Sequence, residues 1–167
     1  MKVFKKRKMG IIPFPQNIFS QQILKSLPLD FTLIYNSKKY KCTTCLAALL
    51  SSKIQIHMLS DTFLNTYSIP NLPGESDGDI QPISDFLTGS PFQFSDTNII
   101  FLFIITSILG ISTIEDKLRE SLNNCLLNLP LEKIVQQTIF LYQHGGDINS
   151  HIKALSIHVS KKIQNSD

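Results

Sequence analysis

The residues with the clearest chemical potential are two cysteines in the sequence Cys42-Thr43-Thr44-Cys45. Their spacing is that of a redox dithiol, and they stand where a predicted strand passes into a predicted helix. A helix N-terminus stabilises a thiolate and lowers the pKa of a thiol, so a thiol redox protein is one hypothesis. The longer parallel sheet that surrounds such a pair in thioredoxin-like proteins is not predicted here, and unpaired cysteines also serve as small buried apolar residues. A structural zinc site would need a second pair of ligands beside Cys42 and Cys45, but the remaining cysteine, Cys125, stands alone.

Three histidines, His144, His151 and His158, recur every seven residues and could suggest metal ligands. Gly145 and Gly146 separate the first from the helix that would carry the other two, so we interpret them as a solvated helix face. The acids are scattered, and the chain has no nucleophile elbow, phosphate-binding loop or metalloprotease motif. The sequence therefore predicts a protein that is not an enzyme and needs no metal or cofactor.

The positive charge of the chain belongs to one short segment. The 167 residues carry 16 bases and 13 acids, but five of the bases lie in the first ten residues, and the rest of the chain has a net charge of −2. Lys5, Lys6, Arg7 and Lys8 could serve nuclear import or contact a nucleic acid or an acidic lipid. They could equally form a solvated end. We do not expect nucleic acid to be the main partner.

The composition predicts a globular chain with a packed core, because 43% of the residues are hydrophobic and 17% are charged. Three cysteines are too few for a disulfide-rich secreted scaffold, so we expect a cytoplasmic protein, with the nucleus as an alternative. Residues 99–111 are almost wholly apolar, but a helix that crosses a bilayer needs roughly 20 residues. We expect this segment to be a buried helix and the protein to have no membrane span.

The hydrophobic pattern predicts an α+β fold with a short three-stranded sheet. Strands are expected over 30–35 and 39–43, joined into a β-hairpin by the turn pair Asn36-Ser37. An amphipathic helix over 17–27 precedes them. The elements expected next are a helix over 44–50, a short helix around 54–59, a strand over 66–69, a helix over 80–87, a small strand or turn over 91–94, and an apolar helix capped by Ser95 and ended by Gly110.

The last third of the chain is predicted to be helical. Ser112 and Glu115 have the spacing of a capping box at a helix start. Two apolar stripes, over 131–142 and 148–163, then predict a helical hairpin. We divide the chain into a basic flexible arm over 1–16, a folded domain over 17–120, and a C-terminal helical extension over 121–167.

Five short motifs follow one another along the chain: Leu24-x-x-Leu27-x-x-Asp30-Phe31-Thr32-Leu33-Ile34, Lys39-Tyr40-Lys41-Cys42, Leu46-Ala47-Ala48-x-x-Ser51, Phe86-Leu87-Thr88-Gly89 and Leu109-Gly110-Ile111 before Leu118. Their order and spacing resemble the BTB/POZ domain family, in particular the divergent BTB-like domains of large protist families. In that family a leading helix is followed by a "D-V-T-L" strand, a hairpin-to-helix passage and a late helix rich in leucine.

The resemblance implies a protein–protein interaction module that forms a homodimer and acts as a scaffold or adaptor. In the family, the leading helix packs across a two-fold axis, which makes Phe19, Ile23, Leu24 and Leu27 the candidate dimer contact. Some members also use the first-strand acid in a charged corepressor pocket. Asp30 matches that acid, but Thr43 and Thr44 replace the histidine and the basic residue that follow the hairpin in the family.

The resemblance also implies an alternative partner. Helices that follow BTB domains help to hold a cullin in ubiquitin ligase adaptors, so a substrate adaptor of a cullin-based ligase is the first alternative to a plain scaffold. The thiol redox protein that uses Cys42 and Cys45 is the second. No small-molecule substrate is expected for the favoured interpretation.

Overall fold

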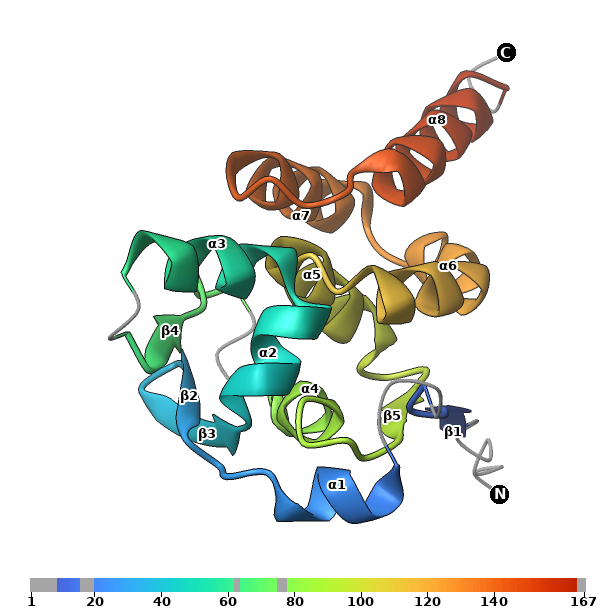
Figure 1. Cartoon of the computed structure of the whole chain (residues 1–167). Coiled ribbons are helices and arrows are strands. Elements are labelled where there is room, and N and C mark those ends of the chain that lie inside the picture. The colour runs from blue at the N-terminus through green and yellow to red at the C-terminus, as the bar shows by residue number, and fades with distance from the viewer. Residues whose placement is uncertain (1–8, 16–19, 62–63, 75–77, 165–167) are drawn as a thin grey trace.

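The computed structural model describes residues 9–15, 20–61, 64–74 and 78–164. Over these ranges the chain has two small sheets and eight helices (Figure 1). The mixed α+β class predicted from the sequence is therefore confirmed. None of the helices in the described part of the chain has both the length and the apolar character needed to cross a membrane.

The larger sheet contains the predicted hairpin. Strand β2 (Phe31–Tyr35) pairs antiparallel with β3 (Lys38–Cys42) and parallel with β4 (Thr66–Ser68). The two turn residues, Asn36 and Ser37, have φ values of 47° and 64°. Two successive left-handed residues match the right-handed twist of a hairpin, and asparagine tolerates this conformation well. The turn thus sets the register in which Leu33 faces Tyr40.

The second sheet was not expected from the sequence. Strand β1 (Met9–Ile12) pairs antiparallel with β5 (Phe92–Ser95), and Ile12 and Phe14 are buried. Residues 9–15 therefore belong to the folded body, whereas the sequence predicted a flexible arm over 1–16. Pro13 and Pro15 made this segment look irregular, but they follow the strand and leave its pairing intact.

Five helices precede or surround the sheets. Helix α1 (Gln21–Ser26) leads into the hairpin, and α2 (Thr44–Leu50), α3 (Ser52–Ser60) and α4 (Gln81–Phe86) follow it in order. Helix α5 (Ile99–Leu109) lies at the centre, with ten of its eleven residues buried. The core joins the inner face of β2 to these helices, and its fully buried side chains include Phe31, Leu33, Tyr35, Leu46, Ile54, Ile83, Phe86, Leu102 and Phe103. The apolar 99–111 segment is thus a core helix, as predicted.

Two predicted helix caps were wrong. Helix α5 begins after Asn98, and Ser95 instead closes the preceding turn by donating its backbone N–H to Oδ1 of Asn98 at 2.7 Å. Helix α6 (Ser112–Leu126) begins after Ile111 and has no side-chain cap. Gly110 fills the bend between α5 and α6 with φ 65°, and a Cβ there would lie 2.1 Å from Oγ of Ser52. The backbone N–H of Glu115, which the predicted capping box would pair with the hydroxyl of Ser112, instead donates to the carbonyl of Ile111 at 3.1 Å.

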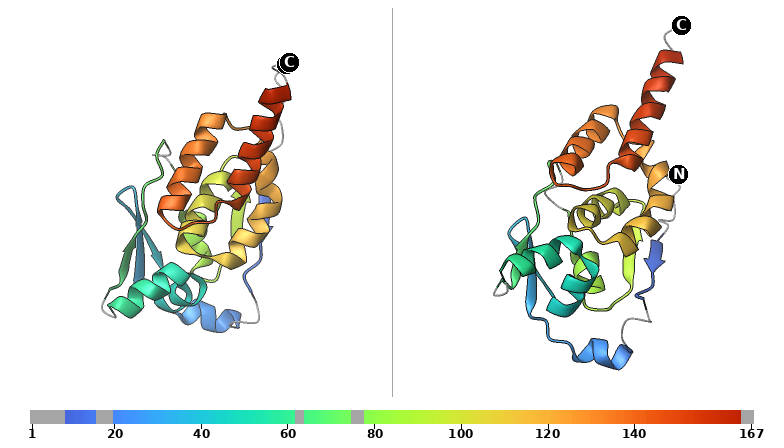
Figure 2. Two further views of the ribbon diagram at one scale, coloured as in Figure 1. Left: turned by 90° about the horizontal axis from the view of Figure 1, so that it is seen from above. Right: turned by 45° about the horizontal axis from the view of Figure 1, so that its top comes forward.

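The C-terminal helical hairpin is present and packs on the rest of the body. Helix α7 (Leu131–Gln143) and helix α8 (Asn149–Gln164) lie side by side above α5 and α6 (Figure 2). Arg119 of α6 forms an ion pair with Asp147 before α8. The backbone N–H of Asp147 donates to Oγ of Ser107 on α5 at 2.6 Å. These contacts hold the start of α8 against both core helices.

Candidate interaction surfaces

Three of the four residues of the predicted dimer contact lie on α1 or directly after it, and they differ in exposure. Ile23 is half-exposed, while Leu24 and Leu27 pack against the core of their own chain. Leu24 lies so close to Gly89 that a Cβ at that position would be 3.0 Å from its Cδ1. Phe19 lies outside the described residues. Of the three predicted residues that the structure describes, Ile23 is thus the most exposed and the best placed for contact with another molecule.

Strand β1 adds two exposed apolar residues that the sequence analysis missed. The side chains of Met9 and Ile11 are 67% and 65% exposed, and they alternate with Gly10 and Ile12, which face the body. In the described part of the chain β1 pairs with β5 only, so its other edge is open. An edge strand with exposed apolar side chains is a template for pairing with another chain. The two-residue alternation was the available signal, although four residues are short for recognising a strand.

Asp30, the residue that matches the family pocket, is engaged within its own chain. Its Oδ1 accepts a hydrogen bond from the backbone N–H of Thr44 at 2.9 Å, at the start of α2. This hydrogen bond holds the pKa of Asp30 below its usual value. Thr43 completes the helix start, since its hydroxyl accepts from the N–H of Leu46 and donates to the carbonyl of Leu87. Asp30 and Thr43 therefore fix the passage from hairpin to helix.

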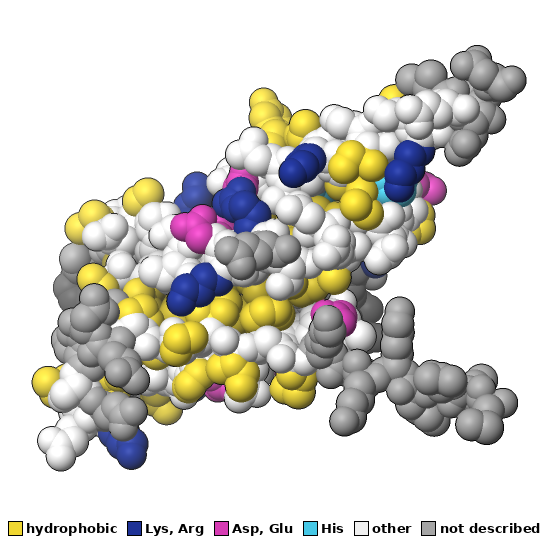
Figure 3. Space-filling model, turned by 90° about the vertical axis from the view of Figure 1, so that its right-hand side faces the viewer, with side chains coloured by type: hydrophobic (Ala, Val, Ile, Leu, Met, Phe, Trp, Pro, Cys, Tyr) yellow, Lys and Arg dark blue, Asp and Glu magenta, His cyan; other side chains and the backbone are white. Residues whose placement is uncertain are grey.

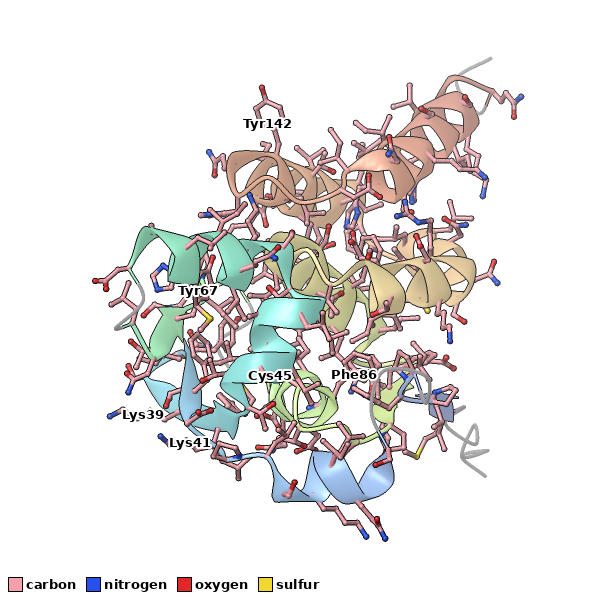
Figure 4. The ribbon with its side chains drawn as sticks, in the orientation of Figure 1. Lys39, Lys41, Cys45, Tyr67, Phe86 and Tyr142 are labelled. Atoms are coloured by element: carbon pink, nitrogen blue, oxygen red, sulfur yellow. The ribbon has the colours of Figure 1, made fainter. Side chains whose placement is uncertain are left out.

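The two cysteines of the predicted dithiol occupy different environments. Cys42 ends β3 and is fully buried, and burial raises the pKa of its thiol to about 12, with a further rise from the nearby carboxylate of Asp30. Cys45 lies on the exposed side of α2 (Figure 4). A redox dithiol needs an accessible thiol of low pKa, so the environment of Cys42 argues against the redox alternative.

The three regularly spaced histidines do not form a solvated face. His151 is fully buried on the inner side of α8, where its ring stacks on Phe103 at a centroid distance of 6.2 Å. His144 instead packs against Phe140 at the end of α7, and His158 is half-buried. The solvated interpretation is wrong for His151, because the inner face of α8 packs against the body. Across the described ranges, no three His, Cys, Asp or Glu side chains are grouped so that they could hold a metal ion.

The surface of the described residues includes two open hollows. One, of about 250 Å³, is mainly apolar and lies between the segment after β1 and helix α6. The other, of about 530 Å³, has a mixed polar and apolar lining from α4, the segments on either side of it and the start of β5, with Asp79 and Asp85 at its edge. The basic residues Lys5, Lys6, Arg7 and Lys8 lie outside the described residues.

Exposed apolar side chains are the most distinctive feature of the surface. They occur on β1, on α3 at Ile56 and Leu59, and along α7. On the face shown in Figure 3, hydrophobic side chains gather on the body below the C-terminal helices and in smaller groups on those helices. Large contiguous apolar patches on a folded protein mark surfaces that bind other molecules, whereas single exposed apolar side chains are normal.

No protein-family model matches this chain, and no curated protein matches it in sequence. The function must therefore be argued from the surfaces themselves and from the order of the elements.

Proposed function

We propose that this chain is a BTB/POZ-like protein–protein interaction module that forms a homodimer through β1 and α1. The observation that carries the proposal is the exposure of Met9 and Ile11 on an open edge strand, together with the half-exposed Ile23 on α1. These side chains lie on elements that follow one another along the chain. Packing them across a two-fold axis would remove apolar surface from water on both copies at once.

The arrangement of the elements supports the family part of the proposal. A leading helix, a hairpin, two helices, a third strand, a further helix and strand, and two late helices follow in the order that the resemblance implies. The dimer surface differs from the one expected from sequence, because Leu24 and Leu27 pack inward and β1 takes their place. The pocket role implied for Asp30 is not part of the proposal, since this side chain caps α2.

The test is the mass of the full chain in solution, measured by light scattering at about 10–50 μM, a range that detects interfaces of micromolar affinity. We expect Ile11→Asp together with Ile23→Asp to weaken self-association, because both charges would be buried at the contact. Leu59→Asp is the matched control, since it places the same charge on an exposed apolar position of α3. A wild-type monomer at these concentrations would refute the homodimer.

A cullin adaptor is a second candidate, favoured by one specific observation. Helix α3 exposes Ile56 and Leu59, and the turn after α7 reaches the start of α3, where a Cβ on Gly145 would lie 3.2 Å from Nζ of Lys53. The C-terminal helical hairpin and α3 could therefore contact one partner together. Retention of the chain by an immobilised cullin N-terminal region, and its loss with Leu59→Asp, would support this function. Equal retention of the wild type and Leu59→Asp, or retention of neither, would contradict the cullin adaptor function.

A further inference from the structure

The C-terminal pair of helices, which we call the α7–α8 hairpin, packs on the body through a small part of its surface. The inner face of α7 buries Ile134, Phe140 and Leu141. On α8 the buried side chains lie in the first two turns, and no described side chain after Ala154 is buried. The second half of α8 extends beyond the body (Figure 2). Apolar packing therefore attaches the hairpin only through α7 and the start of α8.

Buried polar atoms without a partner are concentrated in the same element. In the described part of the chain, five side-chain nitrogen or oxygen atoms are buried and have no hydrogen-bond partner. Four of the five belong to the α7–α8 hairpin: Oε1 of Gln137, both ring nitrogens of His151 and Nε2 of His158. Gln137 lies between Ile134 and Leu141 on the inner face of α7. His151 and His158 are about two turns apart, so they share one face of α8.

These atoms make the closed position of the hairpin less favourable. A buried polar group without a partner has lost its hydration and gained no hydrogen bond in return, and it recovers that loss once water reaches it. Lifting the hairpin from the body would hydrate the inner faces of α7 and α8, while the two helices kept their contact with each other. Each group hydrated in this way favours the open position by roughly tenfold.

Two polar contacts oppose the opening, and both involve the segment before α8. Arg119 of α6 forms an ion pair with Asp147, whose backbone N–H donates to Oγ of Ser107. The side chain of Arg119 is 35% exposed, so water and salt screen this ion pair. Residues 127–130, which join α6 to α7, form neither helix nor strand and have no buried side chain. They provide a hinge at which the hairpin can move without disturbing α6.

We propose that the α7–α8 hairpin is a cover that opens from the body as one unit, about residues 127–130, while the sheets and α2 to α6 stay folded. The unpartnered groups of Gln137 and His151 set how often it opens. Opening makes the surface of α5 around Phe103 and Ser107 accessible, whereas both residues are buried in the closed form. The cover does not depend on the proposed dimer, because α7 and α1 lie at opposite ends of the molecule (Figure 1).

Native-state hydrogen exchange of the full chain over a urea series tests the cover. We expect the amides inside α7 and in the first turns of α8 to exchange through one common opening, at least about tenfold faster than the amides of α5. The urea dependence of that opening should be weaker than that of global unfolding, because less surface becomes exposed. Exchange of α7 and α8 at the rate and urea dependence of α5 would overturn the proposal, since the hairpin would then open only with the whole chain.

Substitutions on the two sides of the contact separate opening from global unfolding. Ile83→Val weakens the buried core beside α4 equally in the closed and open forms. We expect it to accelerate exchange in α5 roughly fivefold and to leave the hairpin rate unchanged. Gln137→Leu with His151→Phe stabilises the closed form alone, so exchange in the hairpin and in α5 should slow together, at least about tenfold.

Gln136→Leu is the matched control for Gln137→Leu, because it makes the same change on the exposed side of α7. We expect it to alter the exchange rates by no more than about twofold, and circular dichroism shows that each variant is folded. Equal slowing by Gln136→Leu and Gln137→Leu would attribute the effect to helix stability and overturn the role of the buried groups. An unchanged hairpin rate in Gln137→Leu with His151→Phe would overturn it as well. Equal acceleration of hairpin and α5 by Ile83→Val would show that the two unfold together.

Discussion

The ring of Phe94 lies directly over Gly10, so closely that a Cβ at position 10 would be 2.1 Å from Cζ of the ring. The two residues face each other in the β1–β5 ladder. Glycine weakens a strand by itself, but here its missing side chain makes room for the aromatic ring. This contact attaches β1, and with it the exposed Met9 and Ile11, to the body.

We expect Gly10→Ala to lower the free energy of unfolding by about 1–3 kcal/mol, because the added methyl group overpacks the contact and displaces the ring. Urea unfolding measures the loss, and faster hydrogen exchange at residues 9–12 locates it. In a Phe94→Leu background the same substitution should cost less, since the shorter side chain leaves space. Equal costs in the two backgrounds would show that the ring does not constrain position 10.

Thiol accessibility distinguishes the two cysteines at positions 42 and 45. With iodoacetamide at neutral pH, we expect the native protein to be modified at Cys45 and protected at Cys42, whose thiol is buried with its pKa raised to about 12. Peptide mass mapping before and after unfolding in urea measures both sites. Rapid modification of native Cys42, or a disulfide between the pair under mild oxidation, would restore the redox alternative.

The cap provided by Asp30 predicts a loss of stability at low pH. The hydrogen bond from Thr44 lowers the pKa of Asp30 in the folded chain. The resulting stabilisation is fully present above the pKa of the unfolded chain and is lost as the pH falls through the pKa of the folded chain. We expect Asp30→Ala to cost about 1 kcal/mol at neutral pH. Asp30→Asn should cost less, because the amide oxygen can still accept the bond. As the pH falls through the folded pKa of Asp30, the wild type should lose most of its advantage over Asp30→Ala.

The sequence predicted the elements whose signals are local. The Asn36-Ser37 pair tolerates left-handed backbone, and the apolar run in α5 can only be buried, so the hairpin and the core helix followed directly. Strand β1 was missed because its stability depends on a ring 84 positions away in the chain, at Phe94. The inward packing of Leu24 likewise depends on Gly89. The candidate site was therefore only partly predictable, since both the strand and the helix that form it are placed by distant residues.

Burial of His151 predicts a second source of instability at low pH, in addition to Asp30. Its ring is fully buried on Phe103, and neither ring nitrogen has a hydrogen-bond partner in the described part of the chain. Burial lowers its pKa from 6.5 to about 4, while the nearby Asp147 acts in the other direction. Between these pH values the unfolded chain binds the proton and the folded chain does not, so stability falls as the pH falls. The expected loss from pH 7 to pH 4 is about 3 kcal/mol.

His151→Phe should remove this loss, because phenylalanine keeps the stacked ring without the basic nitrogens. The comparison must be made between variants, since burial raises the pKa of Glu115 on α6 and gives that group the opposite dependence on pH. Because the folded chain holds the proton of Glu115 more tightly, it loses stability as the pH rises through the folded pKa of Glu115. This contribution is common to the wild type and His151→Phe. Urea unfolding of the wild type and His151→Phe at pH 7 and pH 4 therefore isolates the histidine. Parallel curves for the two proteins would mean that His151 is protonated, or solvated, within the folded chain.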